Sequence, residues 1–227
     1  MAEMEHDMSQ RILIWDVPTR IFHWVLALSF AGAFLTAETE RYRDLHLSLG
    51  YVMLGLIAFR LIWGFVGSRY ARFSSFTFRP SEVIDYLKSL LQRSPKHYLG
   101  HNPAGALAIF LLIGLTLLTG LSGLLLYFEV GGEAFEEVHE VFANGMLAVV
   151  CIHIAGVIVS SLLHGENLVR SMVTGHKHGT PEEGISRAFG WLGVIMAAII
   201  AAFLTLYQPS AGDTSGEPET APTHHEN

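Results

Sequence analysis

The sequence has little charge and almost no cysteine for its length. Of its 227 residues, 15% are Asp, Glu, Lys or Arg, whereas a soluble domain usually carries about 25%. The single cysteine, Cys151, lies in an apolar run, so the chain cannot form an internal disulfide framework. No CxxCH motif occurs, which excludes haem attached covalently through paired cysteines.

Motifs for nucleotide and nucleic-acid binding are also missing. The chain has no GxGxxG, no P-loop and no HExxH, and it has no basic patch with interleaved aromatic residues. These absences disfavour nucleotide-dependent enzymes and zinc proteases. We expect no nucleic-acid partner.

Hydrophobic residues make up 51% of the chain and are gathered into blocks. Five blocks are long enough to cross a hydrocarbon core, which needs roughly 17 to 25 apolar residues. They are residues 21–37, 47–66, 104–128, 141–163 and 188–207. The sequence therefore predicts an all-α integral membrane bundle of four core helices and a fifth C-terminal helix. A signal peptide in the first block is disfavoured because acids accompany Arg11 and four further blocks follow.

Lysine and arginine are divided unevenly between the two sides of the membrane. Eleven fall in segments 1–20, 67–103 and 164–187, whereas the opposite side has only Arg41 and Arg43. Because positive loops stay in the cytoplasm, the N-terminus is predicted inside and the C-terminus outside a bacterial inner membrane. Segment 81–91 has the pattern of an amphipathic helix lying on the cytoplasmic surface.

These features divide the chain into four parts. Residues 1–20 are predicted to be a cytoplasmic N-terminal segment, and residues 21–187 a four-helix membrane domain. Residues 188–207 are the fifth transmembrane helix. Residues 208–227 are rich in Pro, Gly, Thr and Glu, which predicts a disordered, acidic periplasmic tail.

Four histidines lie within or at the edge of the spans: His23, His46, His139 and His153. Ionisable residues at these positions are costly and usually functional. His139 and His153 are 14 residues apart, which on an α-helix places them on nearly one face and ~21 Å apart. Because successive helices run in opposite directions, His23 and His153 fall near the inner side. His46 and His139 fall near the outer side.

This depth matching suits two haem groups. A bis-histidine haem needs two imidazoles on opposite sides of a flat ring at one depth, and each pair joins two different helices. The sequence therefore predicts two haem b groups, one bound by His23 and His153 and the other by His46 and His139. Nearby glycines provide room for the rings, or they serve ordinary close helix packing. These glycines are Gly32, Gly50, Gly55, Gly145 and Gly156.

Two arginines are candidates for binding haem propionates. Arg60 lies 14 residues after His46, at the depth of the inner haem, where an unpaired arginine costs about 2.5–3.5 kcal/mol. Arg20 precedes His23 by three residues. For Arg20, reaching to the lipid headgroups is an equal alternative.

Four parts of the sequence carry a family likeness. They are Trp15-Asp-Val-Pro-Thr-Arg-Ile-Phe-His23-Trp, His46-x-x-x-Gly50-Tyr, Phe59-Arg60-Leu-Ile-Trp63-Gly64, and the histidines at 139 and 153. The chain resembles the bacterial cytochrome b561 family, which includes the b-type subunits of nickel–iron hydrogenases, over about residues 12–177. The resemblance implies a dihaem, quinone-linked cytochrome with the four histidines as ligands. The best-known members have four spans, so the fifth helix and the tail depart from the pattern.

The charge of the outer side suggests a partner. Twelve acids and two arginines give it a formal charge of −10, which would steer a basic periplasmic redox protein such as a c-type cytochrome. The partner is expected to dock on the acidic loop formed by residues 129–140. A solvated acidic loop without a partner is the alternative. His101 and His164, at the cytoplasmic ends of the third and fourth spans, could contact a quinone headgroup or be solvated interface residues.

The expected function is electron transfer between the quinone pool and that periplasmic protein, with membrane lipid as the surrounding solvent. A superoxide-to-quinone oxidoreductase is an alternative, although the anion would be repelled unless Arg41 and Arg43 form a local positive funnel. An alternative of another class is a haem-free transporter or proton relay that uses the membrane histidines.

Overall fold

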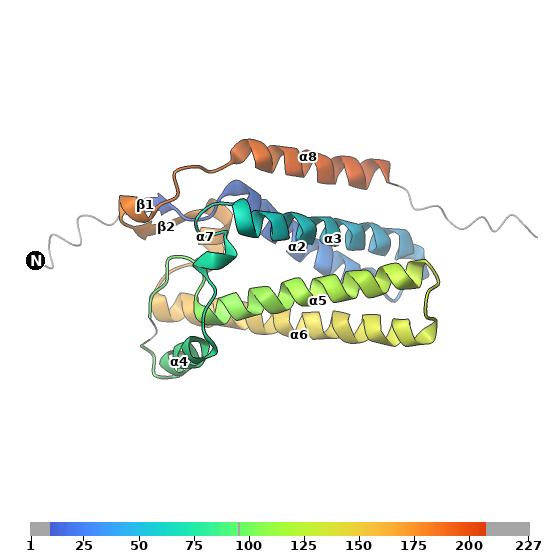
Figure 1. The fold of residues 1–227 in the computed structure, drawn as a ribbon, viewed down its shortest axis with the longest axis horizontal. Coiled ribbons are helices and arrows are strands. Elements are labelled where there is room, and N and C mark those ends of the chain that lie inside the picture. The colour runs from blue at the N-terminus through green and yellow to red at the C-terminus, as the bar shows by residue number, and fades with distance from the viewer. Residues whose placement is uncertain (1–9, 95, 208–227) are drawn as a thin grey trace, which may run out of the picture.

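The computed structural model describes residues 10–94 and 96–207 (Figure 1). The predicted tail 208–227 and the first nine residues lie outside this part. Its α-helices are α2 (Val17–Thr36), α3 (Arg43–Val66), α4 (Pro80–Leu91), α5 (Pro103–Tyr127), α6 (Glu133–His164), α7 (Leu168–Thr174) and α8 (Gly190–Leu206). Two short strands are β1 (Gln10–Leu13) and β2 (His176–Gly179), and the 3-10 turns are η1 (Glu40–Tyr42), η2 (Phe73–Ser75) and η3 (Pro181–Glu183).

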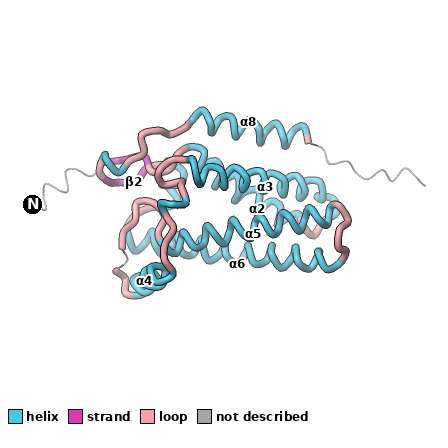
Figure 2. The backbone as a smooth tube through the Cα atoms, in the orientation of Figure 1, coloured by secondary structure: helices cyan, strands magenta, loops and turns pink. Residues whose placement is uncertain are grey.

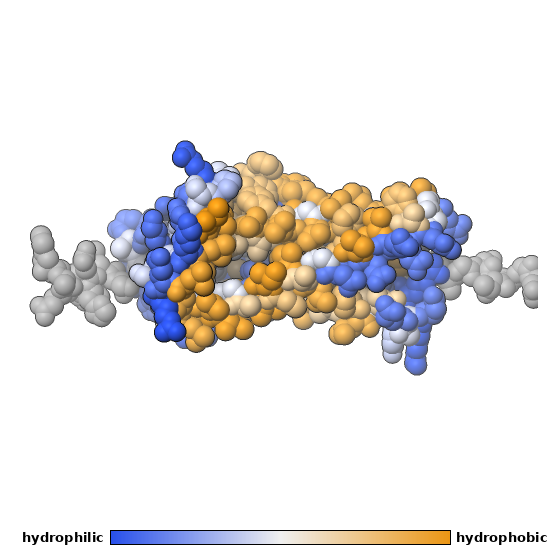
Figure 3. All heavy atoms as spheres, turned by 90° about the horizontal axis from the view of Figure 1, so that it is seen from below, coloured by the Kyte–Doolittle hydropathy of each residue, from blue (hydrophilic) through white to orange (hydrophobic). Residues whose placement is uncertain are grey.

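Among the described residues, four helices are long and apolar enough to cross a membrane. They are α2, the 27-residue stretch Glu40–Val66 that contains α3, and helices α5 and α6. The apolar helix α8 has 17 residues, the lower limit for a span of roughly 17 to 25 residues. Figure 3 shows a hydrophobic band across the middle of the molecule between two hydrophilic ends. The all-α membrane bundle predicted from the sequence is confirmed.

The long helices run side by side with alternating directions (Figures 1 and 2). Helix α5 packs on α6 and α3, α3 packs on α2, and α8 packs on α2. Helices α2 and α5 begin at the end that carries the two strands and α4, whereas α3 and α6 begin at the opposite end. The early part of α2 therefore lies at the depth of the later part of α6. The starts of α3 and α6 lie together at the other end.

A small cap at the end of the bundle was not predicted. Strand β1 pairs antiparallel with β2, with Gln10 opposite Gly179 and Leu13 opposite His176. The buried side chains of Ile12, Ile14, Trp15 and Tyr70 pack against one another in this cap. Each strand has only four residues, too few for an alternating pattern to stand out in the sequence.

Helix α2 begins four residues before the predicted start at residue 21 because Asp16 caps it. One carboxylate oxygen of Asp16 accepts a hydrogen bond from the Thr19 backbone N–H at 2.7 Å, and such a cap satisfies an otherwise unpaired donor. The other oxygen accepts from Trp63 Nε1 at 3.2 Å and from the Ser68 hydroxyl. This fully buried carboxylate therefore joins the start of α2 to the end of α3.

The acidic stretch 129–140 was predicted to be a loop, and this prediction is wrong for most of it. The turn between α5 and α6 covers only residues 128–132, with Gly131 and Gly132 at φ values of +90° and +58°. From Glu133 onward the stretch is the first two turns of α6. Negative side chains favour a helix start because they interact with the positive end of the helix dipole.

The amphipathic helix predicted at 81–91 is α4, which begins one residue earlier. Tyr86 is its buried side chain, and the Tyr86 hydroxyl lies 3.4 Å from the Ser160 hydroxyl of α6. The apolar residues Ile84, Leu87 and Leu91 are exposed on the other side. Helix α4 is thus anchored through Tyr86, which leaves its apolar side available to lipid.

Gly64 allows η2 to approach α3, which gives the first testable prediction. A Cβ atom at this position would overlap the Phe73 ring. Because overpacking typically costs about 1–3 kcal/mol, we expect Gly64→Ala to lower the melting temperature of the purified protein. Gly114→Ala on α5 is the control, since a Cβ there meets nothing within 4 Å. Equal melting temperatures of the two variants would contradict the prediction.

Candidate functional site

The starts of α3 and α6 bring His46 and His139 together. Their ring centroids are 6.2 Å apart and their planes are inclined by 67°. The Nδ1 atom of His46 lies 2.8 Å from the Ala33 carbonyl oxygen, and that of His139 lies 2.9 Å from the Thr119 carbonyl oxygen. A carbonyl only accepts, so each Nδ1 carries the proton and donates. Each Nε2 is left with a free lone pair, the form that binds a metal.

This geometry fits one metal ion between two imidazoles. Nitrogen–metal bonds of about 2 Å on opposite faces of an ion place the two ring centroids on the order of 6 to 6.5 Å apart. The observed 6.2 Å lies in that range. Gly123 leaves room for the His139 ring, because a Cβ there would stand 3.0 Å from His139 Cε1. The residues present therefore suit a haem iron at this end of the bundle.

His23 on α2 and His153 on α6 form the second pair, near the capped end. They lie close enough for the charge of one ring to act on the other. The His23 ring packs edge-on against Trp24 at a centroid distance of 5.0 Å. Its Nδ1 is buried and has no hydrogen-bond partner among the described residues, a state that native interiors rarely retain. The structure thus brings His46 and His139 together at one end of the bundle, and it places His23 and His153 within electrostatic range of each other near the capped end.

Both predicted arginines have protein partners. Arg60 is only 3% exposed, and its guanidinium donates to the Ala71 carbonyl at 2.8 Å and lies 4.9 Å from the Phe73 ring centroid. Arg20 donates to the Thr174 carbonyl at 2.9 Å, while its Nε is buried without a partner in the described part of the chain. Arg20 therefore joins α2 to the end of α7, where a cation is favourable.

The glycines near the histidines serve different purposes. Gly32 packs against Leu49, since a Cβ there would stand 2.8 Å from Leu49 Cδ1, which is close helix packing. A Cβ at Gly50, one turn after His46, would meet nothing within 4 Å. Gly50 is therefore a better candidate than Gly32 for leaving room for a haem ring. Three further glycines also lack a close contact: Gly55, Gly145 and Gly156.

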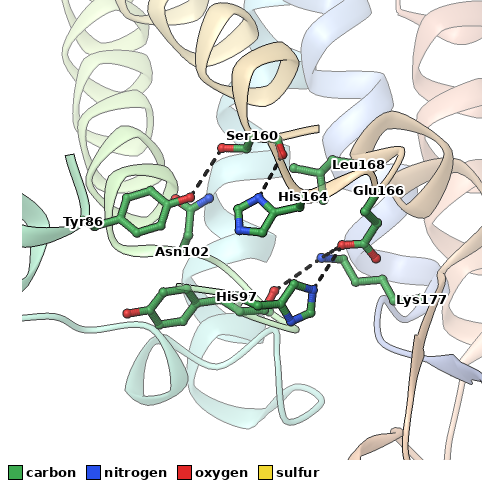
Figure 4. A pocket seen from close by; sticks show the side chains of 10 residues that line it. Tyr86, His97, Asn102, Ser160, His164, Glu166, Leu168 and Lys177 are labelled. Carbon is green, nitrogen blue, oxygen red and sulfur yellow. Dashed lines mark hydrogen bonds and ion pairs between the residues drawn. The ribbon is translucent and has the colours of Figure 1, made fainter. Parts of the chain in front are cut away.

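A polar pocket lies where α6 ends beside the cap (Figure 4). Buried Lys177 donates to Glu166 at 3.1 Å, and His97 Nε2 lies 3.6 Å from the same carboxylate oxygen. Burial lowers the pKa of Lys177, and Glu166 opposes that shift. His164, one of the two candidates for a quinone contact, lines this pocket, whereas His101 does not.

Sequence reasoning missed Asp16 and Lys177. Asp16 had a usable signal, because Asp followed by a proline two residues later is typical of a helix start. Nothing in the sequence marked Lys177 as buried. Across residues 10–94 and 96–207, no group of three or more His, Cys, Asp or Glu side chains is placed to hold a metal ion. His46 and His139 lie together as a pair, an arrangement that suits an iron whose other ligands come from a porphyrin.

Comparison with known proteins gives a consistent result. A family model described as prokaryotic cytochrome b561 matches residues 14–175, which include all four histidines. The chain is 25% identical to the "Probable Ni/Fe-hydrogenase B-type cytochrome subunit" of Rhodobacter capsulatus, over 73% of this chain and 81% of that protein. It is 26% identical to the protein of that name from Rhizobium leguminosarum bv. viciae, over 74% and 89%. It is 33% identical to the protein of that name from Azotobacter chroococcum mcd 1, over 54% of this chain and 62% of that protein. No solved structure gives a significant match.

Proposed function

Because this chain belongs to the prokaryotic cytochrome b561 family, we propose that it is a dihaem b-type cytochrome. It carries electrons between the quinone pool and a periplasmic redox partner. Its ligands are His23 and His153 for the inner haem and His46 and His139 for the outer one. The observation that carries the proposal is the 6.2 Å separation of the His46 and His139 rings, with both Nδ1 atoms held by carbonyls. When bound, haem supplies a reversible one-electron iron couple.

The protein's own contribution at the outer pair is orientation. His46 is held by a carbonyl of α2 and His139 by a carbonyl of α5, so four helices together fix the two rings. The Ser122 hydroxyl, 3.2 Å from His139 Nδ1, adds a second polar neighbour. Such partners fix the tautomer and raise the basicity of the ligating nitrogen.

An absorption spectrum tests the proposal directly. The purified protein should show a strong, reducible Soret band and a sharp α-band, and a pyridine haemochrome assay should give two haem b groups per chain. Acid-acetone should extract all of the haem, because the chain has no CxxCH motif. A haem-free protein would favour the transporter alternative. A stoichiometry near one haem would contradict the two-site proposal.

The outer end of α6 is the proposed docking surface for a basic periplasmic protein. The exposed carboxylates of Glu133, Glu136, Glu137 and Glu140 lie on the first two turns of α6, beside His139. We expect a triple variant, with Glu136, Glu137 and Glu140 each replaced by Gln, to slow electron exchange with a lysine-rich c-type cytochrome and to leave the haem spectrum unchanged. The physical reason is the loss of electrostatic steering.

Salt provides the matching test, since the screening length falls from ~10 Å at 0.1 M to ~3 Å at 1 M. The rate for the unmodified protein should fall towards that of the triple variant as salt rises. A double variant on the other side, Asp85→Asn with Glu182→Gln, also removes exposed acids and should react at the unmodified rate. Equal rates of the triple variant and the unmodified protein at low salt would rule out this docking surface.

The names of the relatives favour a second candidate for the periplasmic partner. The relatives are named as B-type cytochrome subunits of Ni/Fe-hydrogenases, so a hydrogenase subunit is the alternative to a soluble c-type cytochrome. Hydrogen-dependent reduction of the haems in membranes that contain such a hydrogenase distinguishes the two. If hydrogen reduces no haem in those membranes, the soluble partner is favoured.

A further inference from the structure

His101 lies in the connection that leads into α5, wedged between two aromatic rings. Its ring centroid is 4.6 Å from that of Trp15 and 4.5 Å from that of Phe76. Its Nδ1 is sealed from solvent and has no hydrogen-bond partner among the residues that the structure describes. An unpaired buried polar group costs about 1–3 kcal/mol. A native protein therefore retains such a group where something else supplies the partner.

Arg60 and His101 both lie beside the Phe76 ring, and the charge of Arg60 acts on His101. The Arg60 Cζ atom lies 5.8 Å from the centroid of that ring. A guanidinium has five N–H donors, and within the described residues Arg60 uses one of them in a hydrogen bond, to the Ala71 carbonyl. Its charge is almost wholly shielded from water. The charge of buried Asp16 acts on Arg60, but the spare N–H donors of the guanidinium still favour an anion that accepts hydrogen bonds from them.

Two carboxylates at this end of the bundle, Asp16 and Glu166, are already engaged. Asp16 accepts hydrogen bonds from Trp63 and Ser68 in addition to its capping bond. Glu166 pairs with Lys177 at 3.1 Å. In the described part of the chain, neither Asp16 nor Glu166 forms a hydrogen bond with Arg60 or His101.

The His101 ring is held in its neutral form. Burial, and next the charge of Arg60, lowers the pKa of His101 to about 3. A neutral imidazole carries one N–H and can donate one hydrogen bond. His101 also lies within electrostatic range of both His23 and His153, the inner pair.

We propose that His101 and Arg60 together bind one carboxylate, a propionate of the haem held by His23 and His153. The inference rests on the proposed function, because it requires a haem at the inner pair. The sequence alone predicted Arg60 as a partner of a haem propionate, and the structure adds His101. Arg60 supplies the charge. His101 supplies a neutral N–H whose direction is fixed by the rings of Trp15 and Phe76.

The effect of His101 should be visible in the reduction potential of one haem. A hydrogen bond to a propionate withdraws electron density from the haem and so favours the reduced iron. His101→Phe keeps an aromatic ring and removes the donor. In this variant the midpoint potential of the inner haem should fall, and its propionate bending band in resonance Raman spectra should shift. His101→Gln retains an N–H donor, so it should partly restore the midpoint potential and the position of the Raman band.

The controls separate binding from a structural effect. His178→Phe changes an exposed histidine of β2 and should leave both potentials unchanged. The inner haem is identified as the spectral component that disappears in His23→Ala. A shift confined to that component, or loss of the inner haem alone from His101→Phe, supports the proposal.

Three results would overturn the inference while leaving the proposed function intact. They are an unchanged potential and Raman band in His101→Phe, equal shifts of both haems, and loss of both haems from that variant. Absence of haem from the unmodified protein would instead contradict the proposed function itself.

Discussion

The His46→Ala and His139→Ala variants should each contain one haem in place of two and lack the same spectral component. The two ring centroids lie 6.2 Å apart and the rings are held by separate carbonyls, so losing either would leave the iron with one protein ligand. His23→Ala and His153→Ala should both lack the other component. Potentiometric titration of the α-band, together with a pyridine haemochrome assay, measures which component is lost.

A surface histidine is the control for these four variants. His178→Ala changes an exposed residue of β2 and should keep both components. The pairing is contradicted if His46→Ala and His153→Ala remove the same component, because those residues belong to different pairs. Loss of both haems from every ligand variant would instead mean that the two sites do not fill independently.

Replacing Asp16 should have the largest effect on stability. Asp16→Ala removes the cap of α2, which costs about 0.5–2 kcal/mol. It also leaves the buried Trp63 N–H and Ser68 hydroxyl unpaired, at about 1–3 kcal/mol each. We therefore expect a loss of several kcal/mol, seen as a large drop in the melting temperature followed by circular dichroism in detergent.

Asp16→Asn provides a graded comparison. The amide oxygen can still accept the capping hydrogen bond, but the amide nitrogen cannot accept from Trp63 or Ser68. Its stability should lie between those of Asp16→Ala and the unmodified protein. Asp85→Ala, an exposed acid on α4, is the control. If Asp16→Ala and Asp85→Ala have the same melting temperature, Asp16 is not the residue that holds the start of α2 to the end of α3.

The positions of the spans and the depths of the four histidines could be predicted from the sequence. A membrane span is encoded by the composition of one continuous segment. The alternating direction of the helices then fixes which ends share a depth. The observed helices α3 and α5 end or begin within a few residues of the predictions, and His46 and His139 meet as expected. The resemblance to the cytochrome b561 family is likewise confirmed. The assignment of the four histidines as haem ligands stays a prediction.

The polar contacts at the capped end were decided only by the tertiary structure. Asp16 meets Trp63 and Ser68 across 47 and 52 residues of sequence, and no local pattern encodes such a pairing. The acidic stretch before residue 141 could not be told from a loop, because its helical conformation depends on a turn at two glycines and on packing against α5.

His101 shows most clearly the difference between what the sequence predicts and what the tertiary structure determines. From the sequence it was a candidate for contact with a quinone headgroup, with a solvated interface residue as the alternative. Its environment is set instead by Trp15 and Phe76, which reach it from two other segments. Composition determines that a segment enters the membrane, since every residue contributes to that transfer free energy. The surroundings of one side chain depend on which distant residues pack around it, and only the folded chain fixes those contacts.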